Sequence, residues 1–256
     1  FLKEALLLRR DEVASMLLSQ PALLQFTKEE AATRARWLRS AAGLTDVATR
    51  GLIVKMPQLL YLSVETNLTP KLAWLKTELG FSDRELAAMF AKLPALLGYS
   101  LEASLMPKVA YLREDLGLSA FDVRAMLARH PQLFGYSLDG NIAAKAAWLR
   151  RGAGLTRAQA RAVVAAAPSL FSASAASLDA RYEFLRQRLG LSAADAAAAI
   201  VKLPAVLGYA VATNLEPKVA FFTQELGLSQ EELRAVMAKQ PRLLGLRVDG
   251  NLRPKV

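Results

Sequence analysis

The sequence has no cysteine and a single histidine, His130, among its 256 residues. The lack of cysteine excludes disulfides, thiolate metal sites and a cysteine nucleophile, although it does not decide the compartment. One histidine cannot supply a Ser/His/Asp set or the usual metal-ligand spacings, and no glycine-rich phosphate loop is present. His130 falls in the apolar stripe of an expected helix, where other units have Leu93 and Leu203, which favours a packing role. We therefore expect no catalytic residue, no cofactor and no metal.

Long apolar runs are also missing, whereas positive charge is in excess. No uninterrupted run of about 18 apolar residues occurs, so we expect no membrane span. Lys and Arg number 33 against 23 Asp and Glu, which gives a net charge of +10. Such an imbalance favours a polyanionic partner but says nothing about the fold.

The chain repeats itself every 36 or 37 residues. The stretch KLPALLGYSLEASLMPK at 92–108 returns as KLPAVLGYAVATNLEPK at 202–218. A proline and a glycine mark the period independently. The prolines are Pro21, Pro57, Pro94, Pro131, Pro168, Pro204 and Pro241, and the glycines are Gly43, Gly80, Gly117, Gly154, Gly190 and Gly227. We interpret the chain as one domain, residues 1–256, built from about seven stacked units.

Each unit is expected to hold two helices. The first should begin at a column of N-cap residues and end at the glycine as its C′ residue. This column consists of Asn67, Ser104, Asn141, Ser177, Asn214 and Asn251, and a proline such as Pro70 follows three residues later, in the first helical turn.

The second helix should begin at another column of cap residues, namely Thr45, Ser82, Ser119, Thr156, Ser192 and Ser229. Leu86, Met89 and Phe90 form its apolar stripe, and the opposite side carries small residues such as Ala88, which predicts a helix packed on both sides. The proline of the period ends the helix. The apolar tail that follows, as at 95–101, is expected to form a 3₁₀ turn or a packed loop. The fold class is therefore an all-α solenoid.

The repeat resembles the mTERF repeat of the mitochondrial transcription termination factors. The residues that carry the resemblance are NLTPKLAWLKTELGFS (67–82) and NLEPKVAFFTQELGLS (214–229), each leading to a Lys-x-Pro, and it extends from about Leu17 to the end. It implies two α-helices and a 3₁₀ turn per repeat, wound into a left-handed superhelix. It also implies a basic concave groove that holds nucleic acid, usually double-stranded DNA, in mitochondria or chloroplasts. The unit around Pro168 departs most, with Ala180 in place of the helix proline and Ala166 in place of a cation.

Basic residues fall in four columns of the repeat. The first is basic in every unit and consists of Arg34, Lys71, Lys108, Lys145, Arg181, Lys218 and Lys255. It lies in the first turn of the expected first helix, where the helix macrodipole disfavours a cation. Local stability would not select lysine there, so we predict that this column contacts phosphates.

The other columns are more ambiguous. The second lies in the middle of the first helix and consists of Arg39, Lys76, Arg113, Arg150 and Arg186. The third flanks the apolar stripe of the second helix and consists of Arg50, Arg124, Arg161 and Arg234. Both remain candidate nucleic-acid-binding residues, with a solvated face as the alternative. The fourth, at the C-terminal end of the second helix, consists of Lys55, Lys92, Arg129, Lys202 and Lys239, and the dipole there already provides a structural explanation.

Taken together, these patterns predict an organellar, mitochondrial or chloroplast, protein that binds double-stranded DNA and regulates or terminates transcription by occupying its site, most simply as a monomer. Two alternatives stay open: structured-RNA binding in organellar splicing or ribosome assembly, and a helical-repeat scaffold for an acidic protein. Tyr99, Tyr136 and Tyr209 recur in the tail, where a core position is favoured over base stacking.

Overall fold

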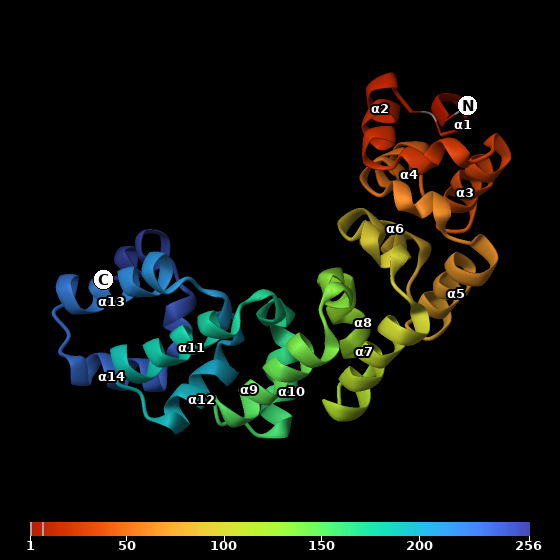
Figure 1. The fold of residues 1–256 in the computed structure, drawn as a ribbon. Coiled ribbons are helices and arrows are strands. Elements are labelled where there is room, and N and C mark those ends of the chain that lie inside the picture. The colour runs from red at the N-terminus through yellow and green to blue at the C-terminus, as the bar shows by residue number, and fades with distance from the viewer. Residues whose placement is uncertain (1, 7) are drawn as a thin grey trace. The chain divides into compact units, whose positions relative to one another are not determined.

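The computed structural model describes residues 2–6 and 8–256, and this part of the chain contains helices, turns and connecting loops but no strand (Figure 1). An all-α repeat architecture is therefore confirmed. Contacts divide the chain into two compact units, one formed by Phe1–Arg113 with Ser119–Gly135 and the other by Glu114–Leu118 with Tyr136–Val256. Each compact unit contains several repeats. The single domain over residues 1–256, and the sense and curvature of the whole array, stay predictions.

The second helices are ten residues long and regular. They are α2 (Arg10–Ser19), α4 (Asp46–Lys55), α6 (Asp83–Lys92), α8 (Ala120–Arg129), α10 (Arg157–Ala166), α12 (Ala193–Lys202) and α14 (Gln230–Lys239). The expected cap residue precedes each helix from α4 onward, as when Ser82 accepts a hydrogen bond from the backbone N–H of Glu85 at 3.4 Å. These helix starts are confirmed.

In each repeat, a 3₁₀ turn follows the second helix, as expected for the apolar tail. The turns begin at the repeated prolines and span Pro21–Gln25, Pro57–Tyr61, Pro94–Gly98, Pro131–Gly135, Pro168–Ser172, Pro204–Gly208 and Pro241–Gly245. Each turn buries apolar side chains such as Leu96 and Leu97 beside Leu86, Met89 and Phe90 of the helix before it. Burying one such side chain stabilises the fold by roughly 1.5–3 kcal/mol.

The first helices combine α-helical and π-helical segments. The α-helical segments are α3 (Lys28–Ser40), α5 (Thr69–Thr77), α7 (Met106–Ala110), α9 (Ala144–Arg151), α11 (Ala175–Glu183) and α13 (Glu216–Ala220), and α1 (Leu2–Ala5) precedes the array. π-Helical turns precede several of them, at Val64–Leu68, Leu101–Leu105, Leu138–Ala143, Val211–Leu215 and Val248–Leu252. Further π-helical turns follow at Tyr111–Asp115, Phe184–Arg188 and Phe221–Glu225, and a 3₁₀ turn at Arg253–Lys255 ends the array.

The starts of the first helices were predicted four residues too late, or three in the unit of α11, where Ser174 is the cap in place of Ser177. Ser63 is the N-cap, accepting a hydrogen bond from the Thr66 backbone N–H at 3.0 Å, whereas Asn67 lies within the helix. Ser100 and Ser137 hold the same cap position in their units. Both columns contain good cap residues, so cap preference alone could not choose between them.

The difference between repeats of 36 and of 37 residues has a structural counterpart in the first helix. Lys71 follows its cap Ser63 by eight positions, and a π-turn fills the interval. Arg181 follows its cap Ser174 by seven positions, and α11 begins without a π-turn. The unit with Ala144 in place of proline still has the π-turn, so the extra residue, rather than the proline, accompanies it. A π-turn is the usual way for a helix to absorb one inserted residue.

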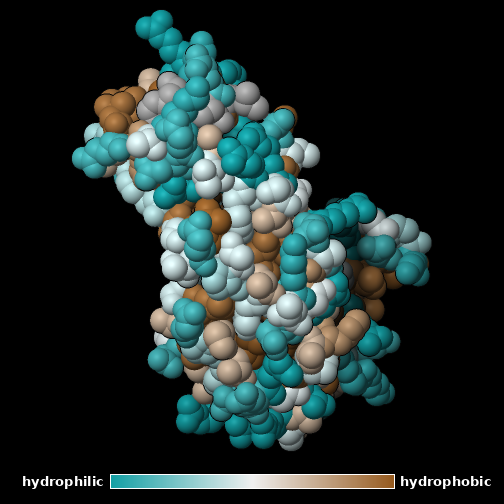
Figure 2. Space-filling model, turned by 90° about the vertical axis from the view of Figure 1, so that its right-hand side faces the viewer, coloured by the Kyte–Doolittle hydropathy of each residue, from teal (hydrophilic) through white to brown (hydrophobic). Residues whose placement is uncertain are grey.

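The six repeated glycines end the first helices as predicted. Their φ angles lie between +65° and +72°, the left-handed region in which a side chain is strained. The small residues of the second helices do not match the expectation, because Ala88 is exposed and is not packed between helices. On the face drawn in Figure 2, apolar side chains form small patches separated by hydrophilic ones. None of the described helices has the length and apolar character needed to cross a bilayer.

Candidate nucleic-acid interface

The four internal lysines of the first column are buried. Lys71 is 1% exposed, Lys218 is 5% exposed, and Lys108 and Lys145 are each 8% exposed. We call these four residues the closing lysines. A buried ammonium group requires hydrogen-bond acceptors, because an unpaired charge in the interior is strongly destabilising.

Each closing lysine donates a hydrogen bond to a backbone carbonyl 26 residues later, at the 3₁₀ turn that ends its own unit. Lys108 Nζ lies 2.7 Å from the Phe134 oxygen, and Lys218 Nζ lies 2.5 Å from the Leu244 oxygen. Lys71 bonds Leu97 in the same way. A second acceptor comes from the column that was predicted to cap the first helix. Asn67, Ser104 and Asn214 accept hydrogen bonds from Lys71, Lys108 and Lys218 at 2.9, 2.8 and 2.5 Å, respectively. The first helix is thereby joined to the end of its unit.

The recurring tyrosines complete this arrangement. The Tyr99, Tyr136 and Tyr209 rings lie 5.6, 5.8 and 4.9 Å from Nζ of Lys108, Lys145 and Lys218. These contacts have cation–π geometry. The tyrosines are half-buried, in agreement with the expected packing role.

Burial lowers the pKa of Lys71 to about 8, and it also lowers the pKa of Lys108, Lys145 and Lys218. The prediction that these lysines contact phosphates is not carried forward, because their ammonium groups point at carbonyl oxygens inside the unit. The helix dipole disfavours a lysine whose side chain stays in the solvent near the helix start. Each of these side chains extends to an acceptor on another element.

Arginine replaces lysine in the two 36-residue units. Arg181 Nε donates to the Tyr209 carbonyl at 2.7 Å, and burial lowers the pKa of Arg181. Arg34 donates to the Glu30 carbonyl at 3.0 Å and lies 5.5 Å over the Phe26 ring. Both arginines are half-buried, so they belong with the structural lysines more than with an exposed surface.

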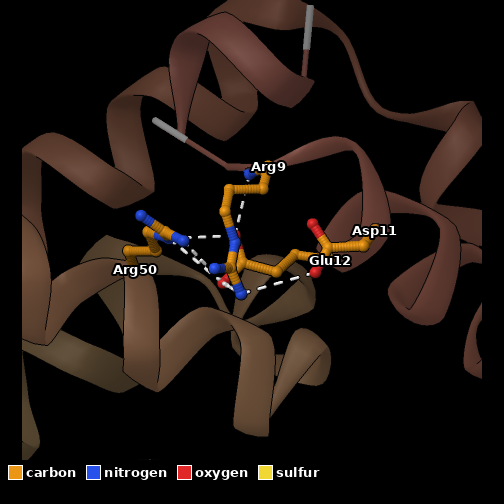
Figure 3. Close-up of polar contacts among 4 residues, drawn as sticks. All are labelled: Arg9, Asp11, Glu12 and Arg50. Carbon is orange, nitrogen blue, oxygen red and sulfur yellow. Dashed lines mark hydrogen bonds and ion pairs between the residues drawn. The ribbon is translucent and has the colours of Figure 1, made fainter.

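The third column mainly connects neighbouring second helices. Arg50 forms a bidentate pair with Glu12, with both closest nitrogen–oxygen distances at 2.9 Å, beside Arg9 and Asp11 (Figure 3). The hydrogen bond from Arg50 lowers the pKa of Glu12. Arg124 on α8 makes the equivalent contact two repeats later.

Arg124 donates to both carboxylate oxygens of Glu85 at 2.7 and 2.8 Å and to the Gly80 carbonyl at 3.1 Å. Arg161 reaches the Gly117 carbonyl at 3.3 Å and is exposed. Arg234 is exposed and makes no ion pair within the described residues. Arg161 and Arg234 are therefore the two members of this column that remain accessible.

The second column divides in the same way. Arg39 pairs with Asp46 at 3.0 Å and Lys76 pairs with Asp83 at 2.5 Å, while Arg186 donates to the Leu191 carbonyl at 2.6 Å. Arg113 and Arg150 are exposed and have no ion-pair partner in the described part of the chain. These two residues stay candidates for a ligand contact.

The fourth column is the most accessible set of cations in the repeat. We call Lys55, Lys92, Arg129, Lys202 and Lys239 the helix-end cations; all five are exposed. Each lies at the last residue of a second helix. The four lysines form no ion pair with any residue that the structure describes. Sequence reasoning gave this column a structural role because the dipole alone explains a cation there.

Helix-end cations of consecutive units are neighbours within each compact unit. Lys202 Nζ lies 3.5 Å from the Lys239 carbonyl oxygen, and Arg242 Nε donates to the Lys202 carbonyl at 3.3 Å. In the other compact unit, Lys55 lines a small groove of about 130 Å³ with Ala91 and Pro94 of the next repeat. Within each compact unit these residues therefore form a short row of accessible positive charge along the ends of stacked helices, and Ala166 at the end of α10 interrupts the column between Arg129 and Lys202.

The described residues contain no group of three or more His, Cys, Asp or Glu side chains placed to hold a metal ion. His130 is the C-cap residue of α8, and burial lowers its pKa, in agreement with a packing role.

The family model described as mTERF matches residues 1–115 and 106–254, which together cover nearly the whole chain. The chain therefore belongs to the mTERF family of helical-repeat proteins. Members of this family are nucleic-acid-binding repeat proteins and typically work in mitochondria or chloroplasts. A search of curated proteins gives no match to the chain.

Proposed function

We propose that this protein binds double-stranded DNA in a mitochondrion or chloroplast and regulates transcription, including its termination, by occupying a DNA site as a monomer. It acts without catalysis, as an obstacle to a moving polymerase. The helix-end cations make the main phosphate contacts. Arg113, Arg150, Arg161 and Arg234 add further contacts, and the closing lysines hold each unit in shape.

The observation that carries this proposal is the sorting of the basic residues by accessibility. Cations whose charge is used internally, such as Lys71 and Arg50, are buried or paired with carboxylates and carbonyls. The helix-end lysines are exposed and form no ion pair within the described residues, so their charge is available to a polyanion. Binding through phosphates positions a duplex without reading its sequence.

The spacing of the row suits a nucleic-acid backbone. Packed helices lie about 8–10 Å apart, which equals roughly two to three base pairs at about 3.4 Å of rise. Successive helix-end cations can therefore meet phosphates at regular intervals along one strand.

The test is a titration of the protein against double-stranded DNA, double-stranded RNA and single strands of matched sequence over a series of salt concentrations. We expect duplex DNA to bind most tightly and its affinity to fall steeply with salt. Tighter binding of structured RNA would move the function to RNA processing. No binding of duplex DNA at low salt would overturn the proposal and favour an acidic protein partner.

A further inference from the structure

A cleft in the Tyr136–Val256 unit is not used by the proposed function. It has a volume of about 520 Å³ and lies between the first helix of one repeat and the beginning of α11. Its lining includes Tyr136, Asn141, Lys145, Trp148 and Ser172. Both its size and its mixture of aromatic and polar groups are typical of small-molecule sites.

Small residues occur around the cleft where other repeats have larger ones. Ala144 stands in place of Pro70, Pro107 and Pro217, and Ala173 stands in place of Tyr99 and Tyr136. Ala175 likewise follows its cap where Leu101 and Leu138 follow theirs. All three alanines line the cleft. The missing volume includes a phenol ring, so the space is suited to an aromatic group.

Asn141 lines the cleft, and its side-chain oxygen is a buried hydrogen-bond acceptor that has no partner. In two other repeats the corresponding Asn67 and Asn214 accept a hydrogen bond from their closing lysine. Lys145 makes the bond to its carbonyl, that of Phe171, at 2.5 Å, but it makes none to Asn141, whose buried Oδ1 has no hydrogen-bond partner. A buried acceptor without a partner costs about 1–3 kcal/mol, so a ligand that donates to it recovers that loss.

The other polar groups narrow the ligand further. Trp148 Nε1 donates to Asp179 at 2.7 Å, so the indole presents its ring, not its N–H, as a contact surface. Lys145 is among the residues that line the cleft, and its positive charge disfavours a cationic ligand. We propose that this cleft binds a small, uncharged aromatic molecule, phenol- or indole-like, whose ring lies against Trp148 and whose O–H or N–H donates to Asn141.

The test follows the indole N–H resonances of Trp37, Trp74 and Trp148 by NMR while phenol, indole or toluene is added. We expect a saturable shift of the Trp148 resonance alone, with a Kd for phenol and indole on the order of 1 mM. Toluene, which has no donor, should bind at least about tenfold more weakly. A Trp148 resonance that moves only in parallel with the other two would overturn the site.

Two variants and one control test the site without removing the ring contact. Ala144→Leu fills the cleft and should weaken phenol binding by at least about tenfold. The control is Ala143→Leu, which should not weaken binding, because the Ala143 side chain does not line the cleft. Asn141→Leu should reduce phenol to the affinity of toluene. Equal binding by the two alanine variants contradicts the cleft, and a preserved preference for phenol in Asn141→Leu contradicts the role of Asn141. The Asn141→Leu result decides the matter if Ala144→Leu fails to fold.

Discussion

We predict that Lys71 makes folding stability rise with pH between about pH 8 and pH 10.5, a range in which the stability of most proteins is constant or falls. Burial lowers its pKa from 10.5 to about 8. The unfolded chain therefore binds a proton that the folded chain has released between these two values. Folding stability increases with pH wherever the unfolded state holds more protons, so the penalty is full below pH 8 and disappears as pH approaches 10.5.

The size of the effect follows from the same shift. One pKa unit is equivalent to about 1.36 kcal/mol, so the folded state carries a penalty of roughly 3 kcal/mol for a charged Lys71. Between pH 7 and pH 9.5 about 2 kcal/mol of this penalty should be relieved. The neutral amine keeps its hydrogen bonds to Leu97 and Asn67, because it still has N–H donors.

Urea unfolding followed by circular dichroism at pH 7 and pH 9.5, at constant ionic strength, measures this change. Lys71→Met should lose about 2 kcal/mol of the pH-dependent gain, whereas Lys92→Met, which removes an exposed lysine, should keep it. The comparison cancels the general loss of net charge with pH. A wild-type pH dependence in both variants would contradict this role of Lys71, as would a Lys71 Cε resonance that titrates near 10.5 and not near 8.

Two further predictions concern the helix ends. Gly227→Ala should cost about 1–2 kcal/mol from strain alone, because its φ is +69° and no atom lies within 4 Å of the added carbon. Gly208→Ala has the same free space without a positive φ and should cost at least about 0.5 kcal/mol less in the same urea titration; equal losses would contradict the strain argument. Ser229→Ala removes the cap of α14 and should cost about 1 kcal/mol by thermal unfolding. A change in melting temperature within experimental error would argue against a stabilising cap.

Features with a local cause could be predicted from the sequence. The repeated proline ends a helix and begins a 3₁₀ turn through its own ring and missing N–H, as at Pro94. Gly80 is needed because of its own φ angle, and Ser82 caps α6 by accepting a hydrogen bond from a backbone N–H only three residues later. The repeat itself follows from these residues, whatever lies elsewhere in the chain.

The role of the first-column lysines could not be obtained in this way. Lys108 bonds a backbone carbonyl 26 residues later, and every residue has a carbonyl, so the acceptor leaves no mark on the sequence. The available signal was the constant spacing between three of these lysines and a preceding tyrosine, as between Tyr99 and Lys108. Charge columns that look equivalent in a sequence differ in exposure only after the chain has folded.

The salt dependence of duplex DNA binding tests most directly whether the helix-end cations meet the phosphates. A variant with Lys55, Lys92, Lys202 and Lys239 replaced by glutamine is compared with one in which the exposed Lys3, Arg10, Lys28 and Arg36 are replaced, so that both lose four charges. The first variant should bind more weakly, and its plot of log K against log salt should be shallower by about 3 to 4. The second should stay close to the wild type. Equal slopes for the two variants would contradict the account.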